Sequence, residues 1–146
     1  MRRFLVAVSI LAFAASAASA DAISDRQALM KERGKIVGTL AKMTKGELPF
    51  EAAEVKNAMQ ALQANAERFD ADALFPAGTE TGGDTTVSPK VWEDMTGFKA
   101  AEDKYLANVK AANAAPAADL DTLKTQLGAV GGDCAACHKA FRIKKG

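Results

Sequence analysis

Apolar residues recur every three or four positions along most of the chain, which is the spacing of one face of an α-helix. Sustained alternation of apolar and polar residues, the pattern of half-buried strands, is missing. The periodicity predicts four helices, over residues 24–44, 51–69, 88–114 and 119 to near the C-terminus. Two short links and one longer link join them. We therefore expect an all-α fold, an antiparallel up-down-up-down four-helix bundle.

Capping and turn residues set the ends of these helices. Ser24 and Gln27 have the spacing of a capping box at the start of the first helix. Ser88 followed by Pro89 is a favoured pair at the start of the third. Residues 70–87 are rich in Gly, Pro and Thr, which predicts a long loop between the second and third helices.

The N-terminal segment has a different pattern from the rest of the chain. Two arginines precede an apolar run over residues 4–15, and small residues at 18–20 follow it. These three parts are typical of a secretory signal peptide, with cleavage after Ala20. The apolar run is shorter than the ~20 residues that a membrane span needs. We expect residues 1–20 to be removed and residues 21–146 to form one periplasmic domain without a membrane span.

Charge narrows the possible partners. The whole chain has a formal net charge of +1, which becomes −1 once Arg2 and Arg3 leave with the signal peptide. A near-neutral protein is not favoured for binding nucleic acid or a membrane surface. The basic stretch at 142–145 is short, and its position at a helix end suits the helix dipole.

Both cysteines of the chain and its only histidine lie within five residues, in the sequence Cys134-Ala-Ala-Cys137-His138. C-x-x-C-H is the attachment motif of a c-type haem. Residues three apart lie on one helical face, so both thiols can reach the vinyl groups of one porphyrin. The motif predicts one haem c, bound covalently through Cys134 and Cys137, with His138 as the proximal axial ligand of the iron.

A disulfide, a redox dithiol and a zinc site fit the two cysteines less well. A disulfide across two residues would close a very small loop and constrain the unfolded chain little. A thioredoxin-like dithiol requires a βαβ setting, which the helical periodicity does not provide. A structural zinc site uses four ligands, and the chain offers three from Cys and His.

A methionine could supply a second axial ligand. The chain beyond the signal peptide contains Met30, Met43, Met59 and Met95. In an up-down bundle, the end of the last helix lies beside the beginnings of the first and third helices. Met43 is therefore at the end of the bundle away from His138, and Met59 is in the middle of its helix. Geometry leaves Met30 and Met95 as equal candidates opposite His138.

The sequences "GGDCAACHKAFRIKK" and "FPAGTETGGDTTVSPKVWEDMTGFKA" resemble the class II c-type cytochromes, which comprise the cytochromes c′ and c-556. The resemblance is to the c-556 branch, in which a methionine of the first helix binds the iron. Met30 in "DRQALMKERG" has that place, which implies that it is the distal axial ligand. The family pattern also implies that Arg26 contacts a haem propionate, for which a guanidinium is well suited.

This resemblance implies an electron-transfer protein of the periplasm, with redox partner proteins and no catalytic residues. The iron would cycle between Fe(III) and Fe(II), six-coordinate and low-spin, with His138 and Met30 as its axial ligands. Methionine ligation raises the reduction potential. The other branch implies the alternative, a five-coordinate cytochrome c′-type protein that binds NO or CO. Members of the family often form homodimers, so a homodimer is also a candidate state.

Overall fold

The computed structural model describes residues 9–144, with side chains from residue 21 onward. Within this part the only extended pairing is an isolated bridge between Val87 and Arg142, so the fold is all-α as predicted. The helices are α1 (Ser9–Thr44), α2 (Ala52–Glu67), α3 (Ala71–Leu74), α4 (Lys90–Glu93), α5 (Met95–Ala114) and α6 (Leu120–Phe141).

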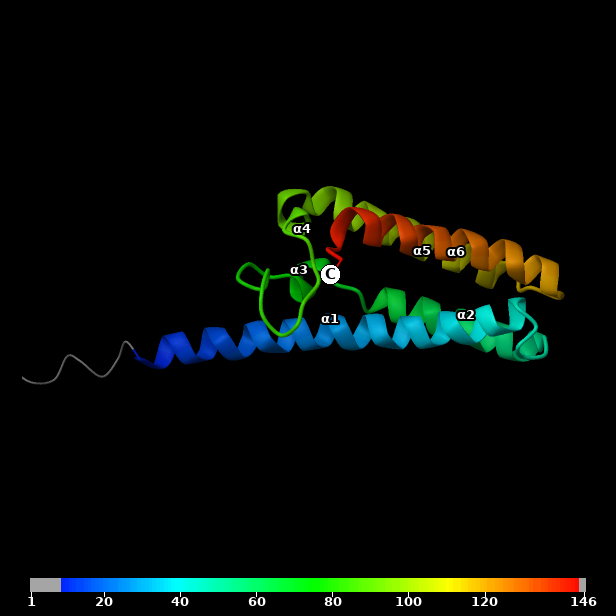
Figure 1. Cartoon of the computed structure of the whole chain (residues 1–146), viewed down its shortest axis with the longest axis horizontal. Helices are drawn as coiled ribbons and strands as arrows, with labels where there is room; N and C mark the ends of the chain where they lie inside the picture. Colours follow the sequence, from blue (N-terminus) through cyan, green and yellow to red (C-terminus); the bar gives the residue numbers. More distant parts are fainter. Residues whose placement is uncertain (1–8, 145–146) are drawn as a thin grey trace, which may run out of the picture.

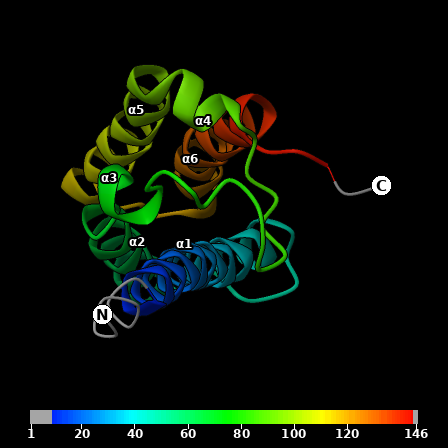
Figure 2. The ribbon, with the colours of Figure 1, turned by 90° about the vertical axis from the view of Figure 1, so that its left-hand side faces the viewer.

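The four long helices form the predicted up-down-up-down bundle. Helices α1 and α2 form one layer and α5 and α6 form the other, with the chain direction alternating along the sequence (Figure 1). Helix α1 packs against α2 and α6, and α5 packs against the same two. Helices α1 and α5 therefore occupy opposite corners of the bundle, as the end view shows (Figure 2).

Two apolar clusters fill the bundle at different levels. The larger cluster takes at least one fully buried residue from each long helix, including Leu40, Leu62, Val109 and Leu123. All four lie in the predicted helices, at apolar positions of the periodic pattern. The second cluster is mainly aromatic: the ring of Phe98 lies 4.7 Å from that of Phe75 and 5.2 Å from that of Phe141, centroid to centroid. This aromatic cluster lies where α6 ends.

The main differences between the predicted and observed helix boundaries lie in the first and third helices, and the N-cap of α4 is Pro89 rather than the predicted Ser88. Within the described residues α1 begins at Ser9, so Ser24 and Gln27 lie inside it and the predicted capping box is wrong. The alanine-rich sequence upstream has high helix propensity and continues the helix. The predicted third helix is interrupted at Asp94 (φ −137°, ψ 60°), whose carboxylate accepts a hydrogen bond of 2.9 Å from the N–H of Gly97 and caps α5.

The long connection between α2 and α5 closes over one end of the bundle. It contains α3, which the prediction of a plain loop did not anticipate, and α4, which is the first part of the interrupted third helix; Asp70 caps α3. Two backbone hydrogen bonds of 2.9 Å join it to the C-terminal tail, from Ser88 N–H to Phe141 O and from Ile143 N–H to Thr86 O. The connection is thereby held beside the last turn of α6.

The predicted signal peptide is only partly covered by the structure. Its two arginines lie in residues 1–8, outside the described residues, and residues 9–20 continue α1. Cleavage after Ala20 stays a prediction. None of the helices in the described part of the chain is both long and apolar enough to span a bilayer.

Candidate functional site

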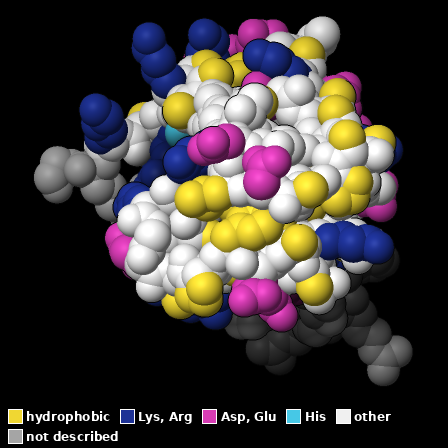
Figure 3. All heavy atoms as spheres, turned by 90° about the vertical axis from the view of Figure 1, so that its right-hand side faces the viewer, with side chains coloured by type: hydrophobic (Ala, Val, Ile, Leu, Met, Phe, Trp, Pro, Cys, Tyr) yellow, Lys and Arg dark blue, Asp and Glu magenta, His cyan; other side chains and the backbone are white. Residues whose placement is uncertain are grey.

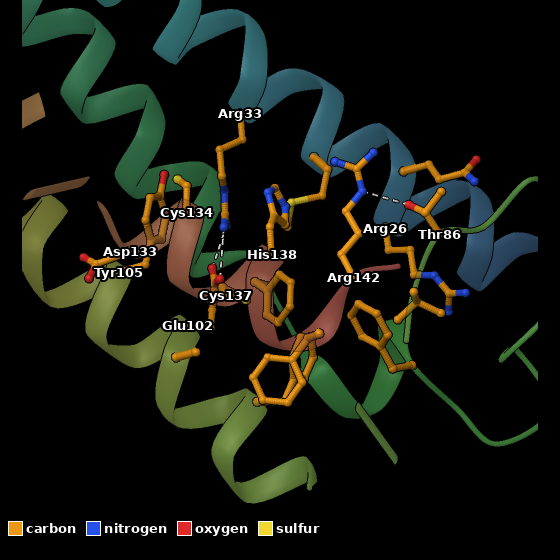
Figure 4. A pocket seen from close by; sticks show the side chains of 18 of the residues that line it. Arg26, Arg33, Thr86, Glu102, Tyr105, Asp133, Cys134, Cys137, His138 and Arg142 are labelled. Carbon is orange, nitrogen blue, oxygen red and sulfur yellow. Dashed lines mark hydrogen bonds and ion pairs between the residues drawn. The ribbon is translucent and has the colours of Figure 1, made fainter. Parts of the chain in front are cut away.

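The three residues of the C-x-x-C-H motif lie on one turn of α6 and face one cavity. The cavity has a volume of about 390 Å³ and is lined by residues of α1, α5, α6 and the 85–87 segment. Cys134 and Cys137 are half-buried in its wall, and His138, which is more exposed to solvent, lines it as well (Figure 4). Met30 and Arg26 of α1 line the same cavity. The structure thus brings all five predicted site residues together.

Local sequence explains why the motif keeps this geometry. Asp119 caps the beginning of α6 by accepting a hydrogen bond of 2.8 Å from the N–H of Thr122. The helix then continues without interruption through Gly131 and Gly132 to Phe141. Because the helix is regular here, Cys134 and Cys137 are neighbours on one face, as their spacing predicts.

The structure separates the two methionines that bundle geometry left equal. Met30 lines the cavity from α1, and α1 packs directly against α6, which carries the motif. Met95 instead packs against the aromatic cluster and is not part of the cavity wall. Met43 and Met59 are buried in the larger apolar cluster, away from the cavity, as expected. Ligation of an iron by Met30 stays a prediction.

Burial and nearby charges set the protonation states of the motif. Burial raises the pKa of Cys134, and it raises the pKa of Cys137 to about 11, so both thiols are protonated at neutral pH. Burial lowers the pKa of His138, and the positive charges of Arg142 and Arg33 lower it further. The imidazole is therefore neutral near pH 7, with a lone pair free for a metal.

Arg26 is buried and binds the connection between α2 and α5. Its Nη1 donates hydrogen bonds to Leu74 O (3.1 Å) and Thr79 Oγ1 (2.9 Å). Its Nη2 donates to Thr79 O (2.6 Å) and Thr85 Oγ1 (3.0 Å). The guanidinium carbon lies 4.9 Å from the centroid of the Phe75 ring. Sequence reasoning missed this structural role, and a contact with a haem propionate stays a prediction.

Sequence reasoning also missed Arg33 and Glu102, which line the cavity beside the cysteines. Arg33 comes from α1 and Glu102 from α5, and their side chains meet in a bidentate ion pair (Figure 4). The available signal was position: Arg33 follows Met30 by three residues and Arg26 by seven, which places all three on one face of α1. Glu102 carried no such signal.

The donor set and charges of the cavity fit a c-type haem. Two thiols and an imidazole share one wall, and a thioether lies in another. Four basic and two acidic side chains line the cavity, an excess that suits a porphyrin bearing two carboxylates. From the outside, His138 is seen among Lys and Arg side chains at one side of the molecular face in Figure 3.

Comparisons with known proteins agree with this fit. The sequence profile of the family described as "Cytochrome C'" matches residues 21–142. The chain is 36% identical over 127 residues to the cytochrome c-556 of Agrobacterium fabrum, covering 87% of this chain and 84% of that protein.

Two solved structures show the same arrangement of helices. The structure of cytochrome c′ from Rhodopseudomonas palustris has a TM-score of 0.80 and 38% identity, covering 86% of this chain and 98% of that one. A nitric oxide complex of a variant of cytochrome c prime from Alcaligenes xylosoxidans has a TM-score of 0.74 and 32% identity, covering 86% and 97%.

Proposed function

This chain belongs to the cytochrome c′ family of haem c proteins, and from this premise we propose that it is a periplasmic electron-transfer cytochrome with one haem. Cys134 and Cys137 would hold the haem through thioethers, and His138 would be the proximal ligand of its iron. The observation that supports this assignment is that all three side chains lie on one turn of α6 in the wall of one cavity.

When bound, the haem supplies an iron that takes up and gives back one electron. The residues of the chain fix its place and its surroundings. The α6 turn presents both attachment points and a neutral imidazole on the same helical face. Phe75, Phe98 and Phe141 line the cavity and keep water from part of it. A dry site of low dielectric strengthens every charge interaction with the iron.

The comparisons support a five-coordinate iron better than a six-coordinate one. The family profile is that of cytochrome C', and similar solved structures are cytochromes c′, one of them a nitric oxide complex. The first candidate is therefore an iron that is open on its distal side and also binds small gases such as NO. In this candidate Met30 is an apolar side chain of the distal wall.

A specific observation favours a second candidate, in which Met30 is the sixth ligand. Its side chain lines the cavity from α1, while Met95 does not reach the cavity. A relative named cytochrome c-556 is 36% identical to this chain. A methionine thioether ligates haem iron in electron-transfer cytochromes and raises the reduction potential.

The absorption and electron paramagnetic resonance spectra of the ferric holoprotein distinguish the two candidates. Five-coordinate iron gives a high-spin spectrum that Met30→Leu leaves unchanged, and the ferrous protein binds CO readily. Methionine ligation gives a low-spin spectrum with a charge-transfer band, and Met30→Leu converts it to high-spin. Met95→Leu is the matched control and should change neither spectrum. A high-spin native spectrum would exclude methionine ligation; a low-spin spectrum lost in Met30→Leu would exclude the open site.

Export and assembly are part of the same proposal. The family profile begins at residue 21, which agrees with a mature chain that starts after Ala20. Sequencing the N-terminus of the protein from a periplasmic fraction tests this cleavage. Redox proteins are the expected partners, and analytical ultracentrifugation of the mature holoprotein tests for the homodimer.

A further inference from the structure

A buried ion pair crosses the bundle at the edge of the cavity. Arg33 Nη2 lies 2.6 Å from Glu102 Oε1, and Arg33 Nη1 lies 3.0 Å from Glu102 Oε2. The two side chains are only 8% and 12% exposed. Because α1 and α5 stand at opposite corners of the bundle, this pair spans its diagonal (Figure 4).

Further contacts fix the guanidinium of Arg33 in this position. Its Nε donates a hydrogen bond of 2.8 Å to Oδ1 of the fully buried Asn65 on α2, and Asn65 Nδ2 donates to Leu29 O at 3.1 Å. The guanidinium also lies 4.2 Å from the centroid of the Tyr105 ring. Each nitrogen of Arg33 thus has an acceptor, so the charge is held rigidly.

This polar layer forms one boundary of the proposed haem site. Arg33, Glu102 and Tyr105 line the same cavity as Cys134 and Cys137. Tyr105 is also part of the larger apolar cluster, and Cys134 packs against that cluster. The ion pair therefore lies where the cavity meets the bundle core.

Stability alone does not explain an ion pair at this position. Desolvation of two charges costs about as much as their attraction returns, and apolar residues of similar volume often stabilise such a site as well or better. The neighbouring core shows that the bundle can be filled with apolar side chains. A fixed charge beside a redox centre does have a different effect, because it changes the energy of the more highly charged ferric state.

We propose that Arg33 and Glu102 act in opposite directions on the reduction potential of the haem iron, with the carboxylate favouring the ferric state and the guanidinium favouring the ferrous state. This inference rests on the proposed haem site. In the intact pair the two effects largely offset each other. Removal of the carboxylate charge alone raises the potential, removal of the guanidinium charge alone lowers it, and removal of both restores it in large part.

The expected size follows from Coulomb's law. One elementary charge about 10 Å from the iron, at an effective dielectric constant of about 20, changes the ferric–ferrous equilibrium on the order of tenfold. A tenfold change corresponds to about 59 mV for a one-electron couple. A charge exposed to water should have a much smaller effect, because the solvent screens it.

The test is a spectroelectrochemical titration of holoprotein variants, after covalent haem content has been measured. Glu102→Gln is nearly isosteric and should shift the equilibrium about tenfold toward the ferrous state. Asp103→Asn removes the same charge from the next, exposed position of α5 and is the matched control, with little shift. The reduction potential of the double variant Arg33→Met/Glu102→Met should lie between those of Glu102→Gln and Arg33→Met.

Each outcome of this titration has a defined meaning. Equal potentials for Glu102→Gln and Asp103→Asn, with haem bound in both, would overturn this inference and leave the proposed function intact. Absence of covalent haem from the native protein would overturn both. If Glu102→Gln does not fold, the potential of Arg33→Met is compared with that of the double variant. The inference is contradicted if the potential of Arg33→Met is not lower than that of the double variant.

Discussion

Arg26 offers a direct test of how the cavity is closed. Substitution by methionine keeps most of the side-chain length and its apolar stem but removes the donors that hold the connection between α2 and α5. Thr79 Oγ1 keeps its own hydrogen bond of 2.8 Å to Pro76 O. The carbonyl oxygens of Leu74 and of Thr79, a fully buried residue, lose the hydrogen bonds that Arg26 donates to them.

The magnitude follows from those lost contacts. A buried group left without a partner costs about 1–3 kcal/mol, and hydrogen bonds to a charged group contribute about 1.5–3 kcal/mol each. Removing the guanidinium also removes its desolvation penalty, the main cause that lowers the pKa of Arg26. We therefore expect a net loss of about 2–4 kcal/mol in the free energy of unfolding.

The assay is urea unfolding of the holoprotein, together with limited proteolysis of the connection between α2 and α5. Arg26→Met should lower the midpoint without changing the haem content and should speed cleavage between residues 75 and 88. Arg68→Met is the control, because Arg68 makes only an exposed ion pair with Glu32 and such pairs contribute little. If Arg26→Met is no less stable than Arg68→Met and is cleaved no faster, the proposed role of Arg26 is wrong.

Three further changes can be followed by urea unfolding. Asp94→Ala removes the N-cap of α5 and should lower the free energy of unfolding by about 1 kcal/mol; an unchanged midpoint would contradict the cap. Gly83→Ala should cost about 1–2 kcal/mol, since Gly83 has φ +51° and an added Cβ would lie 2.9 Å from Ile23 Cγ2. In the haem-free protein, burial lowers the pKa of His138, so protons bind the unfolded state more readily. Its stability should therefore fall as the pH drops below about 6.5, and His138→Asn should flatten that slope.

The features that the sequence predicted correctly are local or periodic. Cys134, Cys137 and His138 share a helical turn, so their common face followed from spacing alone. The bundle followed from apolar periodicity, because each long helix buries the stripe that its sequence contains. Helix ends were less predictable: the cap at Asp94 competes with continuation of the helix, and only the packed structure shows which conformation prevails.

The features that were missed depend on contacts between distant segments. Periodicity placed Met30 and Met95 at the same end of the bundle, but the side-chain packing that puts only Met30 in the cavity wall is tertiary. Arg26 contacts residues 48 to 59 positions away, and Arg33 is 69 positions from Glu102. A charged residue on an apolar face is visible in a sequence, but the partner that allows its burial is not.

Covalent attachment of haem at α6 is the central claim, and it can be measured directly. The protein is expressed with haem-maturation machinery, denatured and extracted with acidified acetone, and the pyridine haemochrome spectrum of the remaining polypeptide is recorded. We predict that one haem per chain stays with the polypeptide, and that Cys134→Ala/Cys137→Ala retains none after the same extraction. A native chain from which all haem is extracted, or which acquires no haem, would contradict covalent attachment at α6.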